Sequence, residues 1–101
     1  MTTKLDKKTS NKSSEEVKEP PKFKIIFIND DFTSMEFVIY VLRTIFHHDE
    51  ASAYKIMMNV HINGKGVAGV FSKEIAETKR EQTLSLARKE EFPLEVLIEA
   101  E

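Results

Sequence analysis

The chain has 101 residues, a formal net charge of −2 and an isoelectric point near 5.9. This size allows one small domain, and the near-neutral charge excludes the strongly basic surface typical of proteins that bind nucleic acid or anionic membranes. The sequence has no cysteine, no apolar run long enough to span a membrane and no apolar secretory signal at its start. These features exclude disulfide scaffolds, thiolate metal sites and cysteine nucleophiles, and they predict a soluble, cytoplasmic protein.

Residues 1–21 consist mostly of Lys, Ser, Thr and Glu, with few side chains to bury. The segment ends in Pro20 and Pro21, which favour an extended backbone. Such a composition predicts a disordered, flexible N-terminal extension, whereas residues 22–101 are expected to form the folded domain. The simplest role for such an extension is to keep the protein soluble.

The sequence after the extension predicts six elements, identified from apolar periodicity and from residues that start or stop helices. Thr33 and Glu36 have the spacing of a capping box for the first helix. Asp49 is the predicted N-cap of the second helix, which Gly64 ends. The predicted elements are a strand over 22–28, helices over 33–48 and 49–64, a strand over 66–71, a helix over 72–91 and a strand over 93–99.

Each predicted element has a face that is expected to be buried. The strand over 22–28 is apolar on nearly both faces, and the strand over 93–99 alternates strictly. The expected inner positions are Met35, Val38, Ile39, Leu42, Ile45 and Phe46 in the first helix, Ala53, Tyr54, Met57, Val60 and His61 in the second, and Leu94, Val96 and Ile98 in the last strand. The order β-α-α-β-α-β predicts an α+β fold, a small three-stranded antiparallel sheet with three helices packed on one face.

Three patterns in the sequence are similar to known functional sites, but the elements or residues around them differ from those that each site requires. An acidic pair after a first strand also occurs in phospho-receiver domains, but these need a later aspartate as acceptor, and only Asp49, at a helix start, follows Asp31. The segment 64–69 matches G-x-G-x-x-G, yet it follows a helix and lies in a strand, the reverse of a dinucleotide-binding turn. His47 and His48 point about 100° apart on a helix and do not share one metal ion. No enzyme, metal or cofactor is therefore predicted.

Asn29, Asp30 and Asp31 lie between the first strand and the first helix, where neither metal nor phosphate chemistry explains them. His61 lies one helical turn after Met57, and the helix pattern alone favours a core histidine with one hydrogen bond. However, carbonyl, carboxylate and imidazole groups can all accept hydrogen bonds. Together, beside an apolar pocket, they suit an α-ammonium group attached to a bulky apolar side chain. An ordinary polar turn is the alternative.

The chain contains three segments with distinctive residues in a fixed order: NDDFTSMEFV (29–38), MMNVHINGKGVAGVF (57–71) and EIAETK (74–79). Together they resemble the ClpS family, adaptors for the ClpA or ClpC unfoldase of ATP-dependent Clp proteases, over roughly residues 22–99. The resemblance implies binding of N-degrons, that is, of proteins whose first residue is Leu, Phe, Tyr or Trp, through the free α-amine and the side chain. It also implies their delivery to the unfoldase for degradation by ClpP.

The resemblance further assigns individual residues. The α-amine contacts would be Asn29, Asp31 and His61, with Asp30 beside them. The hydrophobic pocket would be lined by Phe27, Thr33, Met35, Val38, Met57, Val60 and Leu94, with Met35 as a gatekeeper that resists β-branched side chains. The surface that faces the N-terminal domain of the unfoldase would include Glu74 and Lys79. Nothing in the sequence indicates more than a monomer, or binding to nucleic acid or a membrane.

Two residues depart from the usual pattern of the family. Phe27 stands where a smaller aliphatic residue is usual, which predicts a bulkier pocket wall, and Ser34 stands where Pro is common. The sequence leaves one alternative open, a protein–protein interaction domain of the same fold that does not recognise N-degrons. A similar region occurs in eukaryotic N-recognins within large ubiquitin ligases, but the lack of a further domain in this sequence favours a free-standing adaptor.

Overall fold

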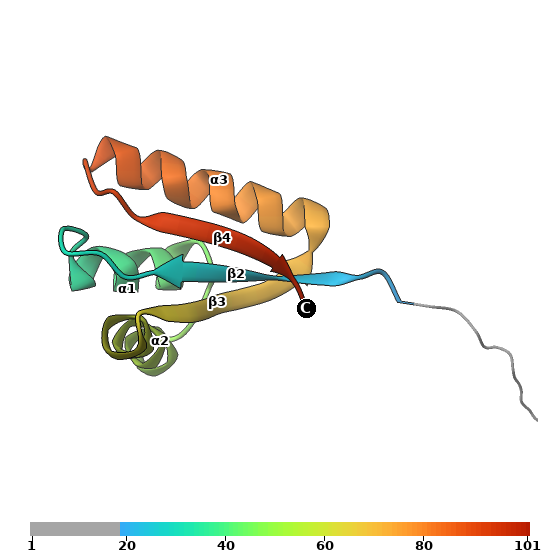
Figure 1. Ribbon diagram of the computed structural model, residues 1–101, viewed down its shortest axis with the longest axis horizontal. Coiled ribbons are helices and arrows are strands. Elements are labelled where there is room, and N and C mark those ends of the chain that lie inside the picture. The colour runs from blue at the N-terminus through green and yellow to red at the C-terminus, as the bar shows by residue number, and fades with distance from the viewer. Residues whose placement is uncertain (1–18) are drawn as a thin grey trace, which may run out of the picture.

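The computed structural model describes residues 19–101, which form the six expected elements in the expected order (Figure 1). The elements are β2 (Lys22–Ile28), α1 (Met35–Thr44), α2 (Glu50–Asn63), β3 (Lys65–Ser72), α3 (Lys73–Lys89) and β4 (Glu95–Ala100). The predicted extension lies, for its first 18 residues, outside the described part of the chain.

The three strands form one antiparallel sheet in the order β3-β2-β4, with β2 in the centre. Phe27, near the end of β2, pairs with Gly66 of β3 on one side and with Val96 of β4 on the other. The central position of β2 explains why its sequence is almost continuously apolar, since both of its edges and one of its faces are covered. The predicted three-stranded antiparallel sheet is confirmed.

The three helices lie on one face of this sheet (Figure 1). Ile25 and Phe27 of β2 point towards the helices and are fully buried in the core, together with Ala68 of β3 and Val96 of β4. Ile26 points to the opposite face and is also buried, because Val67 and Leu97 flank it on the two neighbouring strands. The predicted arrangement of helices on one face is therefore confirmed.

The first helix is shorter than predicted, and its predicted capping box is wrong. Ser34, not Thr33, is the N-cap, because the Ser34 hydroxyl accepts a hydrogen bond of 3.1 Å from the backbone N–H of Phe37. The helix ends at Thr44 instead of residue 48. Beyond it, His47 has a left-handed backbone (φ 61°), which turns the chain before α2 begins.

The ends of the second helix are as predicted. The Asp49 carboxylate accepts a 2.8 Å hydrogen bond from the backbone N–H of Ser52, and this bond is the main reason why the pKa of Asp49 is lowered. Gly64 ends the helix with φ 89°, a left-handed conformation that costs glycine little. α3 begins after Ser72, although the Ser72 side chain makes no capping hydrogen bond.

The inner faces of the helices agree with the prediction only in part. Val38, Leu42 and Phe46 of the first predicted stripe are buried, as are Ala53, Met57 and Val60 of the second. Met35, Tyr54 and His61 are exposed, whereas Phe37 and Val41, which were not predicted, are buried. The buried residues of α1 thus form a face that includes Phe37 and Val41, because α1 packs against α2 and contributes to the core that the sheet also lines.

Gly66 lets α2 lie close to β3. A Cβ atom at this position would be 2.8 Å from Cγ2 of Val60, a distance that requires the helix or the side chain to move. We expect Gly66→Ala to lower the free energy of unfolding by about 1–3 kcal/mol, the usual cost of overpacking. Chemical denaturation would measure the change, with the exposed neighbour Lys65→Ala as the matched control; equal stability of both variants would contradict the close packing inferred here.

Candidate functional site

The loop between β2 and α1 is held by the carboxylate of Asp30. Its Oδ1 atom accepts hydrogen bonds from the backbone N–H groups of Phe32 (2.8 Å) and Thr33 (2.7 Å). Its Oδ2 atom accepts a third hydrogen bond, of 2.7 Å, from the Thr33 hydroxyl. Both carboxylate oxygens are thus engaged within the loop, which fixes the turn between the strand and the helix.

Asn29 ties this loop to the end of the second helix. Its backbone N–H donates a 2.9 Å hydrogen bond to the carbonyl oxygen of Gly64, the C-cap residue of α2. Because His61 lies in the last turn of the same helix, this bond brings the imidazole towards the loop. Residues more than thirty positions apart in the sequence therefore meet at one end of β2.

A cavity of about 430 Å³ opens at this junction. It is lined by nine residues that the sequence assigned to the site: Asn29, Asp30, Asp31, Thr33, Met35, Val38, Met57, Val60 and His61. The apolar residues Val38, Met57 and Val60 are almost entirely buried, whereas Asn29, Asp31 and His61 are exposed. The cavity therefore has an apolar interior and polar side chains where it meets solvent.

Asn29, Asp31 and His61 can accept hydrogen bonds from a bound molecule. Among residues 19–101, no side chain or backbone group makes a hydrogen bond to the Asp31 carboxylate or to the His61 imidazole. An exposed carboxylate beside an amide oxygen and an imidazole nitrogen favours a positively charged donor. The arrangement can hold an ammonium group while an attached apolar group enters the cavity.

Two of the predicted pocket residues do not line this cavity. Phe27 is 0% exposed and contacts the ring of Phe46 edge-on, with the ring centroids 5.6 Å apart. Its place in β2 directs it into the core between the sheet and the helices, so its bulk fills the core and does not narrow the cavity. Leu94 is 5% exposed and also belongs to the core.

The cavity is also lined by three residues that were not predicted from the sequence, namely Phe32, Ser34 and Glu36. All three lie within the predicted segment 29–38, so their positions were predictable but their orientation was not. Ser34 has a structural role as the helix cap. Phe32 is 76% exposed, the highest value among the large apolar side chains of the described residues.

Met35, the predicted gatekeeper, is the first residue of α1 and is 43% exposed. It lines the cavity together with Val38, one helical turn further on. An unbranched side chain at this place can shape the cavity without closing it.

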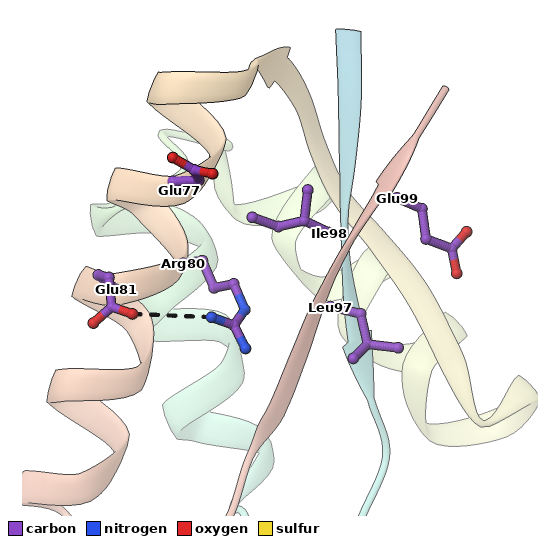
Figure 2. A pocket seen from close by; sticks show the side chains of 6 residues that line it. All are labelled: Glu77, Arg80, Glu81, Leu97, Ile98 and Glu99. Atoms are coloured by element: carbon purple, nitrogen blue, oxygen red, sulfur yellow. Dashed lines mark ion pairs between the residues drawn. The ribbon is translucent and has the colours of Figure 1, made fainter.

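A larger cavity, of about 810 Å³, lies between α3 and β4 and contains none of the predicted site residues. Figure 2 shows Glu77, Arg80 and Glu81 on α3, with Ile98 pointing towards that helix and Leu97 and Glu99 pointing away. Arg80 is engaged in the fold, because its Nε donates a 2.7 Å hydrogen bond to the carbonyl oxygen of Val96 and its Nη1 lies 3.9 Å from Glu81. The candidate site is therefore the smaller cavity, where the acceptors and the apolar surface coincide.

The two residues assigned to the unfoldase surface differ in their surroundings. Glu74 is exposed in the first turn of α3. Lys79 is half-buried, and its Nζ donates a 2.6 Å hydrogen bond to the carbonyl oxygen of Ile45, beside the rings of Phe46 and Phe71. Lys79 thus connects α3 to the end of α1 and contributes to the fold.

The described residues contain no group of His, Cys, Asp and Glu side chains arranged to hold a metal ion. In the same part of the chain, no helix is long and apolar enough to cross a membrane.

Taken together, the fold and this cavity define a small α+β binding domain. Residues 18–97 match the sequence model of a protein family, which is described as "ATP-dependent Clp protease adaptor protein ClpS". The chain belongs to the ClpS family, as its motifs predicted.

Individual relatives agree with this assignment. A ClpS protein of Alkalilimnicola ehrlichii is 51% identical over 79 residues, which are 78% of this chain and 74% of the relative. A ClpS protein of Roseobacter denitrificans is 49% identical over 84 residues, 83% of this chain and 74% of the relative. Both are named as Clp protease adaptors and not as enzymes, and this chain is likewise an adaptor of the Clp protease.

A solved structure extends the comparison to three dimensions. Agrobacterium tumefaciens ClpS2, bound to L-phenylalaninamide, is similar to this chain with a TM-score of 0.78 and 36% sequence identity. The similarity covers 82% of this chain and 100% of that structure.

The Asp30 carboxylate should stabilise the folded loop. Its burial raises the pKa of the carboxyl, but the hydrogen bonds from the Thr33 backbone, the Thr33 hydroxyl and the Phe32 backbone outweigh this and leave the pKa below its ordinary value of 3.8. We expect Asp30→Ala to lower the free energy of unfolding at pH 7 by roughly 1–2 kcal/mol, as for the loss of a capping side chain.

The pH dependence provides a second check on the role of Asp30. A carboxyl with a lowered pKa in the folded state contributes its full stabilisation above the pKa of the unfolded chain and loses it as the pH falls through the folded pKa. The unfolding free energies of the wild type and of Asp30→Ala should therefore converge as the pH falls below about 4. Asp31→Ala is the matched control, and an equal loss of stability in that variant would contradict the role given to Asp30.

Proposed function

We propose that this adaptor binds proteins with a bulky hydrophobic N-terminal residue, Leu, Phe, Tyr or Trp, and delivers them to a ClpA-type or ClpC-type unfoldase for degradation by ClpP. The observation that carries the proposal is the coincidence of acceptors and apolar surface at one cavity. Asn29, Asp31 and His61 would accept hydrogen bonds from the α-ammonium, while the first side chain lies against Val38, Met57 and Val60.

The bound molecule in the Agrobacterium structure supports the proposal. L-phenylalaninamide has a free α-amine, an apolar ring and a blocked carboxyl group, so it is a small analogue of an N-terminal phenylalanine residue. The protein that binds it shares this fold and 36% of its sequence with our chain. A ligand of the same kind suits the cavity described here.

Energetics explain why both halves of the ligand would be required. Burial of a Leu or Phe side chain contributes roughly 1.5–3 kcal/mol, and each hydrogen bond to a charged group contributes roughly 1.5–3 kcal/mol. The apolar part and two or three such bonds together reach about −8 kcal/mol, which corresponds to micromolar affinity. A phenylalanine in the middle of a chain has no α-ammonium and would lose most of this binding energy.

Asp30 has a different role in this proposal from that of its neighbours. Its Oδ1 atom accepts hydrogen bonds from Phe32 and Thr33, and its Oδ2 atom accepts one from the Thr33 hydroxyl. We therefore assign Asp30 to the positioning of the loop that presents Asn29 and Asp31.

Met35, at the edge of the cavity, would restrict the binding of β-branched first side chains. The adaptor would act as a monomer in the cytoplasm.

Binding of a peptide should depend on its free α-ammonium group. A labelled peptide that begins with Phe should bind in a fluorescence anisotropy titration, and the same peptide with an acetylated N-terminus should not. Asp31→Ala and His61→Ala should each weaken binding at least tenfold, the smallest loss expected for a charged hydrogen bond of roughly 1.5 kcal/mol.

The control for this experiment is Glu50→Ala, which removes an exposed carboxylate from the helix that carries His61 but does not line the cavity. It should bind like the wild type. Unchanged affinity in either Asp31→Ala or His61→Ala, or equal binding of the acetylated peptide, would refute the proposed site and favour an interaction domain that uses the acidic pair only as a turn.

A further prediction separates the two residues assigned to the unfoldase surface. Glu74→Ala should weaken binding to the N-terminal domain of the unfoldase while the thermal midpoint of the adaptor stays unchanged, because Glu74 is exposed. Lys79→Ala should lower that midpoint, because it removes the hydrogen bond to Ile45. Calorimetry and a pull-down with the isolated domain would measure both effects, and wild-type unfoldase binding by Glu74→Ala would exclude this residue from the interface.

A further inference from the structure

Phe32 is an exposed aromatic residue at the mouth of the cavity, and the hydrogen bonds to the α-ammonium do not need it. It lines the cavity, yet 76% of its surface remains accessible to solvent. The ring is therefore a large apolar surface beside the cavity, and an apolar side chain of a bound molecule would gain free energy by covering it.

The position of Phe32 is fixed by the loop. Its own backbone N–H and that of Thr33 are hydrogen-bonded to Asp30 Oδ1, at 2.8 and 2.7 Å, so the residue is held on both sides by short bonds. The ring is therefore presented from a rigid turn, and little backbone entropy would be lost when a ligand covers it.

A peptide whose first residue occupies the cavity would have its second residue near the Phe32 ring. Successive side chains of an extended chain point in opposite directions, and consecutive Cα atoms are about 3.8 Å apart. If the first side chain points into the cavity and the ammonium lies at Asp31, the second side chain points outwards over the rim. Phe32 follows Asp31 directly in the sequence and lines that rim.

We propose that Phe32 forms a subsite for the second residue of the bound N-degron and favours a large apolar or aromatic side chain at that position. This inference rests on the proposed function, because it assumes that the first residue is bound by the cavity. It adds a second determinant of specificity, which acts through apolar contact outside the pocket.

The test compares two peptides, Phe-Leu and Phe-Ala at their first two positions and otherwise identical, by fluorescence anisotropy with the full-length protein. Partial burial of a leucine side chain against Phe32 should make the Phe-Leu peptide bind roughly fivefold more tightly to the wild type. In Phe32→Ala the ratio of the two affinities should fall to about one, and in Phe32→Tyr it should be retained.

Tyr40→Ala is the matched control, since it removes another exposed aromatic residue of the same region that does not line this cavity. Its affinity ratio should equal that of the wild type. Equal affinities of the wild type for both peptides, or an unchanged ratio in Phe32→Ala, would overturn the subsite and leave the proposed function intact. Failure of both peptides to bind the wild type would instead overturn the proposed function itself.

Discussion

The carboxylate of Asp30 is the group on which the geometry of the site depends. Three hydrogen bonds, from two backbone N–H groups and one hydroxyl, convert a short polar connection into a fixed turn. The turn determines where Asn29 and Asp31 lie with respect to α2, and it begins α1 at Met35. The backbone bond from Asn29 to Gly64 then attaches the end of the second helix. A site made from two distant segments is in this way held together by local hydrogen bonds, so that a ligand meets acceptors that are already in place.

The sequence contained enough local information to predict the fold. Asp49 and Gly64 mark the ends of α2 because their capping chemistry involves only neighbouring residues. The start of α1 was harder to predict, since Thr33 and Ser34 are adjacent hydroxyl residues that can both cap a helix. Thr33 bonds to Asp30 instead, and Ser34 becomes the cap. This competition depends on the path of the loop, which the pattern of residue types does not contain.

Most of the site residues predicted from the shared motifs line one cavity, whereas predicted residues whose orientation depends on packing do not. Phe27 and Leu94 are apolar residues that the resemblance assigned to the pocket, but each is directed into the core. Phe32 differs from its expected environment in the opposite direction. An aromatic residue would ordinarily be expected to be buried, but Phe32 is exposed and lines the cavity. Lys79 was assigned to a surface by its motif, whereas its hydrogen bond to Ile45 also makes it part of the packing between α1 and α3. One motif residue can therefore serve both the fold and an interface.

The two ends of the central strand, β2, lie at opposite ends of the domain. β2 has seven residues and rises by about 3.3 Å per residue, so its two ends are roughly 20 Å apart. The cavity adjoins the end at Ile28, while the N-terminal segment of the chain joins the strand at Lys22. A molecule in the cavity and a partner that holds the residues before β2 would thus approach from opposite ends of the domain without competing for space. Because β2 joins these two ends through its own backbone, tension between them would pass along this one strand, which is hydrogen-bonded to a neighbour on each side.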